Sequence, residues 1–262
     1  MSDHYDLTRL NSALGESIYA GKLNFFPEIA STNTLAMHAA VAGSEEGSAF
    51  LADQQTGGRG RNGHSWHSES ATAVLLSVVF RPRIAVAQSL WLSLMAGVAA
   101  HDAIAKTCGI GCDLRWPNDL LIGKKKVCGI LTEISADQEL LRFAVIGIGL
   151  NVNQSSFPAD ISRLATSIAI ETGRAWPRTD LLLALLESLQ AEYFRTLAKN
   201  GTQSLLGRVE SISSYVRGKS VRVDESGGFE GVTDGLDEQG FLLVRTRSGV
   251  RKVLSGGVRD LS

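Results

Sequence analysis

The sequence predicts an α+β protein with a large domain over residues 1–213 and a small one over residues 214–262. In the large domain, apolar runs typical of strands are joined by short turns, and two long segments have the apolar repeat of core helices. Because hairpin turns join antiparallel neighbours, we expect a mixed, largely antiparallel sheet with helices packed on it. Short alternating runs with glycine turns predict a small β-barrel in the second domain.

The first half of the chain contains strands, helices and a glycine-rich loop. Ser31, Thr32 and Asn33 offer side-chain caps to a short helix, and Gly109 ends a long apolar one. The run AVLLSVVF is apolar and rich in β-branched residues, which favours a buried strand. In chain order, we expect strands over residues 23–26, 49–53 and 73–80, and helices over residues 34–42 and 86–107.

The second half of the chain extends the sheet and adds one strongly amphipathic helix. Gly123 and the lysine run after it are typical of a hairpin with Lys124 and Lys125 at its tip and Lys126 pointing inward. The helix over residues 179–199 is expected to bury leucines and Phe194. We expect sheet strands over residues 114–116, 120–122, 127–134 and 141–153, and barrel strands near residues 221, 241 and 250.

Composition limits the classes of partner. Of the 262 residues 44% are hydrophobic, and 26 basic side chains nearly balance 27 acidic ones. This balance gives no overall attraction to nucleic acid or to an anionic membrane, so any anion site must be local. No apolar run approaches the roughly 18 residues of a membrane span. The three cysteines lie in or beside apolar segments without metal-ligand spacing, which favours buried thiols in a cytoplasmic protein with no dedicated metal site.

The stretch DQQTGGRGRNGHSW, residues 53–66, places two arginines among glycines. Glycine lets the backbone approach a ligand closely, and arginine presents a planar, permanently charged set of donors that suits carboxylates and phosphates. The glycines also match the G-x-G-x-x-G pattern. However, a β-type run follows them, whereas the dinucleotide and P-loop motifs require a phosphate-binding helix. The stretch therefore predicts an anion site of another kind.

Four separated segments resemble the biotin protein ligases: Ser31-Thr32-Asn33, residues 55–66, RWPNDLLIGKKKVCGIL at residues 115–131, and VIGIGLNVN at residues 145–153. Their order and spacing are similar to that family over nearly the whole chain. The resemblance implies a class II synthetase-like catalytic domain followed by an SH3-like domain. It also implies that biotin is activated by ATP, with Mg²⁺, to biotinyl-5′-AMP. Biotin is then joined to a lysine of a biotin carboxyl carrier protein, a subunit of acetyl-CoA carboxylase.

The chemistry of that reaction explains the residue types. Biotin's carboxylate must approach the α-phosphate of ATP, and like charges about 4 Å apart repel by about 4 kcal/mol at an effective dielectric constant of 20, so cations are needed. By resemblance, the catalytic candidates are Lys126, Arg61, Arg59 and Asp119. The biotin-binding candidates are Ser31, Thr32, Asn33, Gln55, Arg59, Gly60, Arg61, Lys126, Gly129, Gly147 and Gly149. The candidates for contact with ATP or the adenylate are Arg59, Arg61, His64, Trp66, Asn118, Lys126 and Asn151.

Three positions within these segments carry further predictions. His64 stands where the loop of the family usually has another arginine, so the adenylation rate should depend on pH between about 6 and 7.5. Gly147 and Gly149 interrupt an apolar strand, which indicates either close approach of a ligand to the backbone or a bulge.

Other functions fit part of the sequence. A lipoate ligase or octanoyl transferase would share the broad fold, but the Gly-Arg-Gly-Arg and Trp-Pro-Asn-Asp segments favour biotin. A nucleic-acid-binding module would use the arginines on phosphates, which the balanced charge disfavours. A non-catalytic biotin binder would not need Arg59, Arg61 and Lys126. Regulatory family members carry a helix-turn-helix domain before the Ser-Thr-Asn segment, and the 30 residues before Ser31 are too few for one. We therefore expect no DNA partner, and a homodimer stays open.

Overall fold

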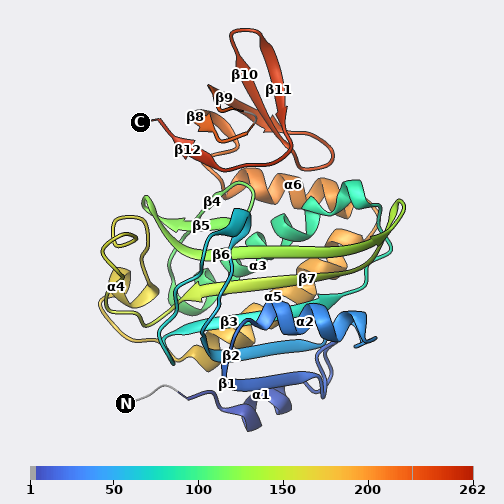
Figure 1. The fold of residues 1–262 in the computed structure, drawn as a ribbon, viewed down its shortest axis with the longest axis vertical. Helices are drawn as coiled ribbons and strands as arrows, with labels where there is room; N and C mark the ends of the chain where they lie inside the picture. Colours follow the sequence, from blue (N-terminus) through green and yellow to red (C-terminus); the bar gives the residue numbers. More distant parts are fainter. Residues whose placement is uncertain (1–3, 226, 262) are drawn as a thin grey trace.

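The computed structural model describes residues 4–225 and 227–261, and its large domain is built on a seven-stranded sheet (Figure 1). The strands lie in the order β1-β2-β3-β7-β6-β5-β4. β1 and β2 are parallel, and every other neighbouring pair is antiparallel. The predicted mixed, largely antiparallel sheet is thus confirmed. Its strands are β1 Leu23–Ile29, β2 Ala49–Gln55, β3 Ala73–Phe80, β4 Asp113–Arg115, β5 Asp119–Ile122, β6 Lys125–Asp137 and β7 Leu140–Asn151.

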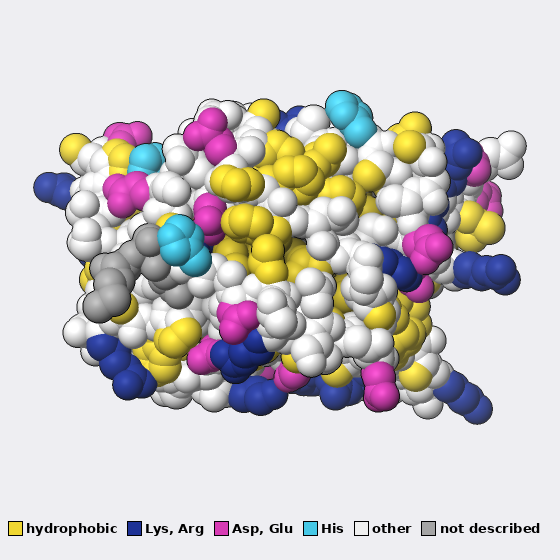
Figure 2. Space-filling model, turned by 90° about the horizontal axis from the view of Figure 1, so that it is seen from below, with side chains coloured by type: hydrophobic (Ala, Val, Ile, Leu, Met, Phe, Trp, Pro, Cys, Tyr) yellow, Lys and Arg dark blue, Asp and Glu magenta, His cyan; other side chains and the backbone are white. Residues whose placement is uncertain are grey.

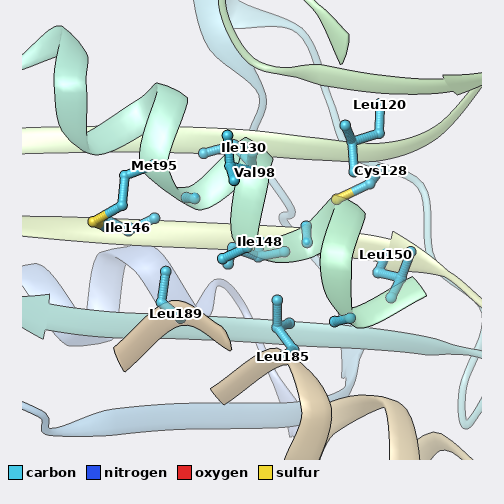
Figure 3. Packing of buried hydrophobic residues seen from close by; sticks show 14 of the residues in the cluster. Met95, Val98, Leu120, Cys128, Ile130, Ile146, Ile148, Leu150, Leu185 and Leu189 are labelled. Atoms are coloured by element: carbon cyan, nitrogen blue, oxygen red, sulfur yellow. The ribbon is translucent and has the colours of Figure 1, made fainter. Parts of the chain in front are cut away.

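Helices cover both faces of this sheet. α3 (Leu90–Cys108) and α5 (Arg178–Leu197) pack on one face, and α2 (Thr32–Val41) packs on the other (Figure 1). Because side chains alternate along a strand, every second residue of β3, β6 and β7 points toward α3 and α5. Ile130 and Ile148 of the sheet pack there against Met95 of α3 and Leu185 of α5 (Figure 3). The other helices are α1 Leu7–Ala13, α4 Ile168–Thr172 and α6 Gly201–Ser211, with 3-10 turns η1 Arg61–Gly63 and η2 Val86–Gln88.

The small domain is a five-stranded antiparallel sheet in the order β11-β10-β9-β8-β12. It lies beyond α6 (Figure 1), and its buried side chains continue the core of the large domain. The indole N–H of Trp116, in the β4–β5 turn, donates to the carbonyl of Gly240 at 2.9 Å. The strands near residues 221, 241 and 250 are as predicted, whereas residues 229–236 and 258–260 form strands that were not; barrel closure and the boundary at residue 213 stay predictions. The strands are β8 Arg217–Val223, β9 Phe229–Leu236, β10 Leu242–Thr246, β11 Gly249–Val253 and β12 Val258–Asp260.

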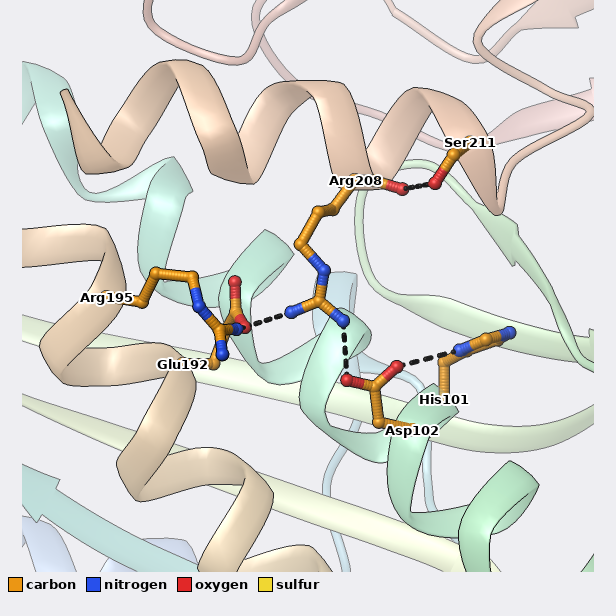
Figure 4. A network of polar contacts seen from close by, with 6 residues as sticks. All are labelled: His101, Asp102, Glu192, Arg195, Arg208 and Ser211. Atoms are coloured by element: carbon orange, nitrogen blue, oxygen red, sulfur yellow. Dashed lines mark hydrogen bonds and ion pairs between the residues drawn. The ribbon is translucent and has the colours of Figure 1, made fainter.

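An ion network joins α3, α5 and α6 (Figure 4). Glu192 of α5 is buried and contacts the guanidinium groups of both Arg195 and Arg208. Arg208 of α6 also donates to Asp102 of α3 at 2.5 Å, and Asp102 contacts His101. A buried carboxylate needs such partners because its desolvation is costly. The network therefore fixes α6, which leads into the small domain, against the helices of the large one.

β1 forms one edge of the sheet. Pro27 within it has no N–H, which disfavours pairing with a further strand. Figure 2 views the molecule from this side and shows hydrophobic side chains gathered in the middle of the face, with most lysine and arginine side chains nearer its rim. None of the helices in the described part of the chain is long and apolar enough to cross a bilayer.

The structure corrects several sequence-based expectations. Phe194 is 51% exposed, because Tyr193 and Leu189 lie on the buried stripe of α5 instead. The long helix begins at Leu90, since residues 86–88 form η2. α1, α4 and α6 were not predicted. Their 7, 5 and 11 residues give a weak periodic signal.

The cysteines are free thiols, and burial raises the pKa of Cys108 to about 11 and that of Cys112 to about 12.

Candidate functional site

The candidate site lies on the face of the sheet opposite α3 and α5. Its floor is formed by two successive rows of residues that face this side of the sheet. One row pairs Ser77 of β3 with Gly147 of β7, and the other pairs Gly149 of β7 with Gly129 of β6. β7 keeps a regular register with both neighbours at these glycines. The bulge considered for Gly147 and Gly149 is therefore wrong, and the glycines leave a bare stretch of backbone in the middle of the floor.

Protein side chains fill the space above these glycines. A Cβ atom on Gly147 would lie 2.1 Å from Oδ1 of Asn33, and one on Gly149 would lie 2.5 Å from the ring of Trp66. A Cβ atom on Gly129 would lie 2.7 Å from both the Trp66 ring and Cε of Lys126. Contacts this short do not occur in real structures, so each glycine is required for its neighbour to reach the floor.

A polar wall lines one side of the site, made of the buried Thr32, Asn33 and Ser77 and the half-buried Gln55. Thr32 donates to Oε1 of Gln55 through its backbone N–H at 2.8 Å and its hydroxyl at 2.9 Å. The Ser77 hydroxyl lies 2.8 Å from Oγ1 of Thr32 and 2.6 Å from Oδ1 of Asn33. Ser31 caps α2 by accepting from Thr34 N at 3.4 Å. Each member is held by another, so the wall presents its amides and hydroxyls in fixed orientations.

Lys126 and Asp119 form an ion pair at the opposite side of the site. Nζ of Lys126 lies 2.6 Å from Oδ1 of Asp119, and Arg115 donates to Oδ2 at 2.7 Å. Burial alone would raise the pKa of Asp119, but the charges of Lys126 and Arg115 outweigh it and hold that pKa below its ordinary value. Lys126 points inward as predicted, and Lys124 and Lys125 are exposed. Asp119 therefore stays ionised and orients the Lys126 ammonium.

Arg61 reaches this side of the site from the glycine loop, residues 57–66. Its Nη1 donates to Oδ1 of Asn118 at 3.1 Å, and Nδ2 of Asn118 donates to the carbonyl of Ile130 at 2.8 Å. Burial lowers the pKa of the Arg61 guanidinium, and the charge of Asp119 opposes that shift. The pKa of an arginine is so high that the group still carries its charge at neutral pH. Asn118 thus anchors a permanent cation beside the cavity.

Arg59, the other arginine of the glycine loop, turns toward β6. Its Nη2 donates to both carboxylate oxygens of Glu133 at 3.1 Å, and its side chain is 52% exposed. Glu133 also accepts from Nδ2 of Asn33 at 2.9 Å. The glycine loop therefore touches the polar wall indirectly, through one carboxylate of the sheet.

The structure brings most of the predicted site residues to one cavity. Asp119 stands behind Lys126, and exposed His64 lines an outer cavity beside the first one together with Arg59, Arg61 and Glu133. Asn151 does not line the main cavity but lines a further one together with Trp66 and Lys126; its buried amide donates to the carbonyl of Thr166 at 3.0 Å and accepts from Gln154 at 3.0 Å. The predicted residues that line the main cavity are Ser31, Thr32, Asn33, Gln55, Arg59, Gly60, Arg61, Trp66, Asn118, Lys126, Gly129, Gly147 and Gly149.

The sequence did not point to every residue of the site. Ser77 is the one polar side chain in the otherwise apolar run of β3, and Glu133 is a charged residue within a strand, so both left a weak signal. A further cavity on the other side of Trp66 and Lys126 contains these two residues and Asn151, all predicted, but its apolar lining left no signal. Apolar side chains from the irregular segment after β7 line it, namely Phe157, Ile161, Leu164 and Ala165. The described residues hold no group of three His, Cys, Asp or Glu side chains placed to bind a metal.

Comparison with known proteins agrees with this arrangement. Residues 25–151 match the model of the Biotin/lipoate A/B protein ligase family. A protein of Bacillus spizizenii named bifunctional ligase/repressor BirA is 35% identical over 236 residues, which cover 88% of this chain and 71% of that protein. The chain belongs to the biotin protein ligase family. Within the family, the biotin--[acetyl-CoA-carboxylase] ligase of Mycobacterium tuberculosis is 32% identical, over 92% of this chain and 89% of its own length.

A solved structure of the family has the same fold. The biotin protein ligase of Aquifex aeolicus in complex with biotin and ATP superposes with a TM-score of 0.78 and 31% identity, over 91% of this chain and 97% of that one. A match over 91% of the chain has to extend into residues 214–262. The resemblance inferred from four short segments therefore extends to the architecture of nearly the whole chain.

Proposed function

We propose that this protein is an ATP-dependent biotin ligase that modifies a biotin carboxyl carrier protein. In the first step, an oxygen of biotin's carboxylate attacks the α-phosphorus of ATP, which forms biotinyl-5′-AMP and expels pyrophosphate. In the second, the amine of a carrier lysine attacks the acyl carbon, which forms the amide and expels AMP. The observation that carries this proposal is that one cavity contains both a fixed, uncharged polar wall and three cationic side chains.

The two sides of the cavity match the two ends of biotin. The wall of amides and hydroxyls suits the neutral ureido head, which has both donors and acceptors. Lys126 and Arg61 suit the carboxylate and the α-phosphate, whose repulsion they would offset. The roles of Ser31, Thr32, Asn33, Gln55 and the lining glycines in holding biotin belong to this proposal.

The glycine loop would protect the adenylate. A mixed anhydride hydrolyses when water reaches it, so a covering loop preserves it until the carrier lysine arrives. Trp66 lies against the floor with Nζ of Lys126 5.4 Å from its ring centre. Its buried indole N–H has no partner in the described part of the chain, so it is available to an acceptor on the nucleotide. The proposal also assigns Asn118, His64 and Asn151 to contacts with the nucleotide.

ATP would enter as its magnesium complex, because Mg²⁺ neutralises the polyphosphate. Asp119, the carboxylate beside Lys126, is already bound by Lys126 and Arg115. The metal would therefore be held mainly by the phosphates of the substrate. We place the reaction in the cytoplasm, where ATP is available and buried free thiols are stable. Net charge near zero supports the absence of a DNA partner, and a homodimer stays a prediction.

ATP–pyrophosphate exchange tests the proposed function. We expect the purified protein to exchange label between pyrophosphate and ATP when biotin is added and not when lipoate or octanoate replaces it. Labelled biotin should then appear on an added biotin carboxyl carrier domain only in the presence of ATP. Exchange that depends on lipoate, or no exchange with either acid, would contradict the proposal.

A further inference from the structure

Glu133 occupies a position that the proposed chemistry does not use. It lies on β6 two residues beyond Leu131, and alternation along the strand turns it to the same face as the cavity. Its side chain is 28% exposed. Of the described residues that line the outer cavity, Glu133 alone is acidic, and it faces Arg59, Arg61 and His64.

The carboxylate of Glu133 joins two parts of the site. From the sheet side, it accepts from Nδ2 of Asn33, whose amide is fixed because its Oδ1 accepts from Ser77. From the loop side, it accepts from Nη2 of Arg59. A continuous series of close polar contacts therefore runs from Gln55 and Thr32 through the polar wall to the glycine loop.

The glycine loop is otherwise held mainly by its own bonds. Gly60 N donates to the carbonyl of His64 at 2.7 Å, and Trp66 N donates to the carbonyl of Gly58 at 2.9 Å, so the loop is a small hairpin. Side-chain contacts bring this hairpin to the sheet: Arg61 to Asn118, Trp66 on the glycine floor, and Arg59 to Glu133. The contact of Arg59 is the most exposed of these, which makes it the easiest to exchange for another anion.

We propose that Glu133 is a positioning residue: it holds Arg59, and with it the glycine loop, against the polar wall until an anionic substrate replaces its carboxylate. The ion pair keeps the loop near its closed position without contributing to the chemistry. An entering carboxylate or phosphate competes with Glu133 for the same guanidinium group. Part of this inference deepens the proposed function and rests on it. After pyrophosphate leaves, Arg59 returns to Glu133, so a loop without this ion pair would release biotinyl-5′-AMP into solution.

Amide hydrogen exchange of the ligand-free protein tests the positioning role. Glu133→Gln keeps the shape and the acceptor for Asn33 but removes the charge that holds Arg59. We expect exchange across residues 57–66 to become about two- to fivefold faster, the factor that an ion pair of this exposure supports. Glu139→Gln, which removes the same charge from an exposed site on the same β6–β7 hairpin, should leave this exchange unchanged.

A double-mutant cycle separates the ion pair from a general change in the strand. Arg59→Gln should accelerate exchange of the loop by a factor similar to that of Glu133→Gln, and the double variant should show no further increase. Unchanged exchange in Glu133→Gln, equal acceleration in Glu139→Gln, or accelerations that multiply in the double variant would each overturn the proposal.

The activity of Glu133→Gln provides a second measurement. Its rate of biotin-dependent ATP–pyrophosphate exchange should stay within about twofold of the unmodified protein, while the fraction of biotinyl-5′-AMP released into solution rises about two- to fivefold, in parallel with hydrogen exchange. A release fraction that does not rise contradicts the positioning role. An unmodified protein without biotin-dependent exchange activity would instead contradict the proposed function, and the hydrogen-exchange result would still decide the role of Glu133.

Discussion

The polar wall and the glycine loop face each other across one cavity, yet they are built in different ways. In the wall, Thr32, Asn33 and Ser77 are at most 4% exposed and bind one another. In the loop, Arg59 is 52% exposed and bonded to a single carboxylate. A neutral ligand group gains most from donors and acceptors that are already oriented, whereas a loop that must admit ATP and then exclude water has to move. Under the proposed function, this difference would assign recognition to the wall and charge compensation to the loop and its surroundings.

Removal of Lys126 should have the largest effect on the adenylation rate, because it removes a cation from the charged side of the cavity. It leaves the polar wall intact. We expect Lys126→Met to lower the rate of biotin-dependent ATP–pyrophosphate exchange by about 10²- to 10³-fold, the range found when one group that stabilises a transition-state charge is lost. The affinity for biotin should fall much less, since the ureido side is intact. Lys125→Met is the matched control, because Lys125 is the exposed neighbour on the same strand. Similar losses in both variants would contradict the distinction between the two sides.

Gly147→Ala should damage the wall and spare the charged side. The new methyl group would lie 2.1 Å from Oδ1 of Asn33, so that side chain has to leave the wall. Overpacking of this kind costs about 1–3 kcal/mol, and we expect biotin affinity, measured by calorimetry, to fall about tenfold or more. Gly207→Ala on α6 provides the control, because no atom beyond the local helix backbone lies within 4 Å of the place its methyl group would take. Unchanged biotin affinity in Gly147→Ala would show that Asn33 does not contact biotin.

Trp116→Phe should weaken the β4–β5 turn, which positions Arg61 and Lys126 on the charged side of the cavity. Its indole N–H binds the carbonyl of Gly240, and the turn that it begins continues to Asn118 and Asp119, which hold Arg61 and Lys126. We expect the free energy of unfolding to fall by about 1–3 kcal/mol and adenylation to slow about three- to tenfold. Trp176→Phe also removes an indole hydrogen bond, to Thr172, and should leave adenylation unchanged. If both variants slow it equally, the small domain has no specific role in positioning the cations.

His64→Arg should have the smallest effect, because His64 is exposed on the outer cavity. The substitution replaces a titratable imidazole with a guanidinium that keeps its charge. As the sequence predicts, the ratio of the variant's adenylation rate to that of the unmodified protein should rise with pH between about 6 and 7.5, by about threefold or less at an exposed position. His38→Arg on α2 serves as the control. Parallel pH profiles would show that residue 64 does not act on the adenylate.

The fold was predictable where one strong local signal determined it. The run AVLLSVVF forms β3 over the predicted residues 73–80, because every side chain in it is buried. The family resemblance predicted that Lys126 and the glycine-loop arginines lie together, and the structure brings all three to one cavity. Glu133 was not predicted, because its role depends on Asn33 and Arg59, which are 100 and 74 residues away in the sequence. For Gly147 and Gly149 the sequence left either a close ligand or a bulge open, and only the structure shows that the side chains of Asn33 and Trp66 approach the backbone there.

A crystal structure of the protein with biotin tests the central claim most directly. We predict that the ureido ring lies against Thr32, Asn33 and Gln55, and that the carboxylate points toward Lys126 and Arg61 within hydrogen-bonding distance of at least one of them. Biotin bound in the reverse direction, or bound outside the cavity between the polar wall and the Lys126–Asp119 pair, would contradict the account.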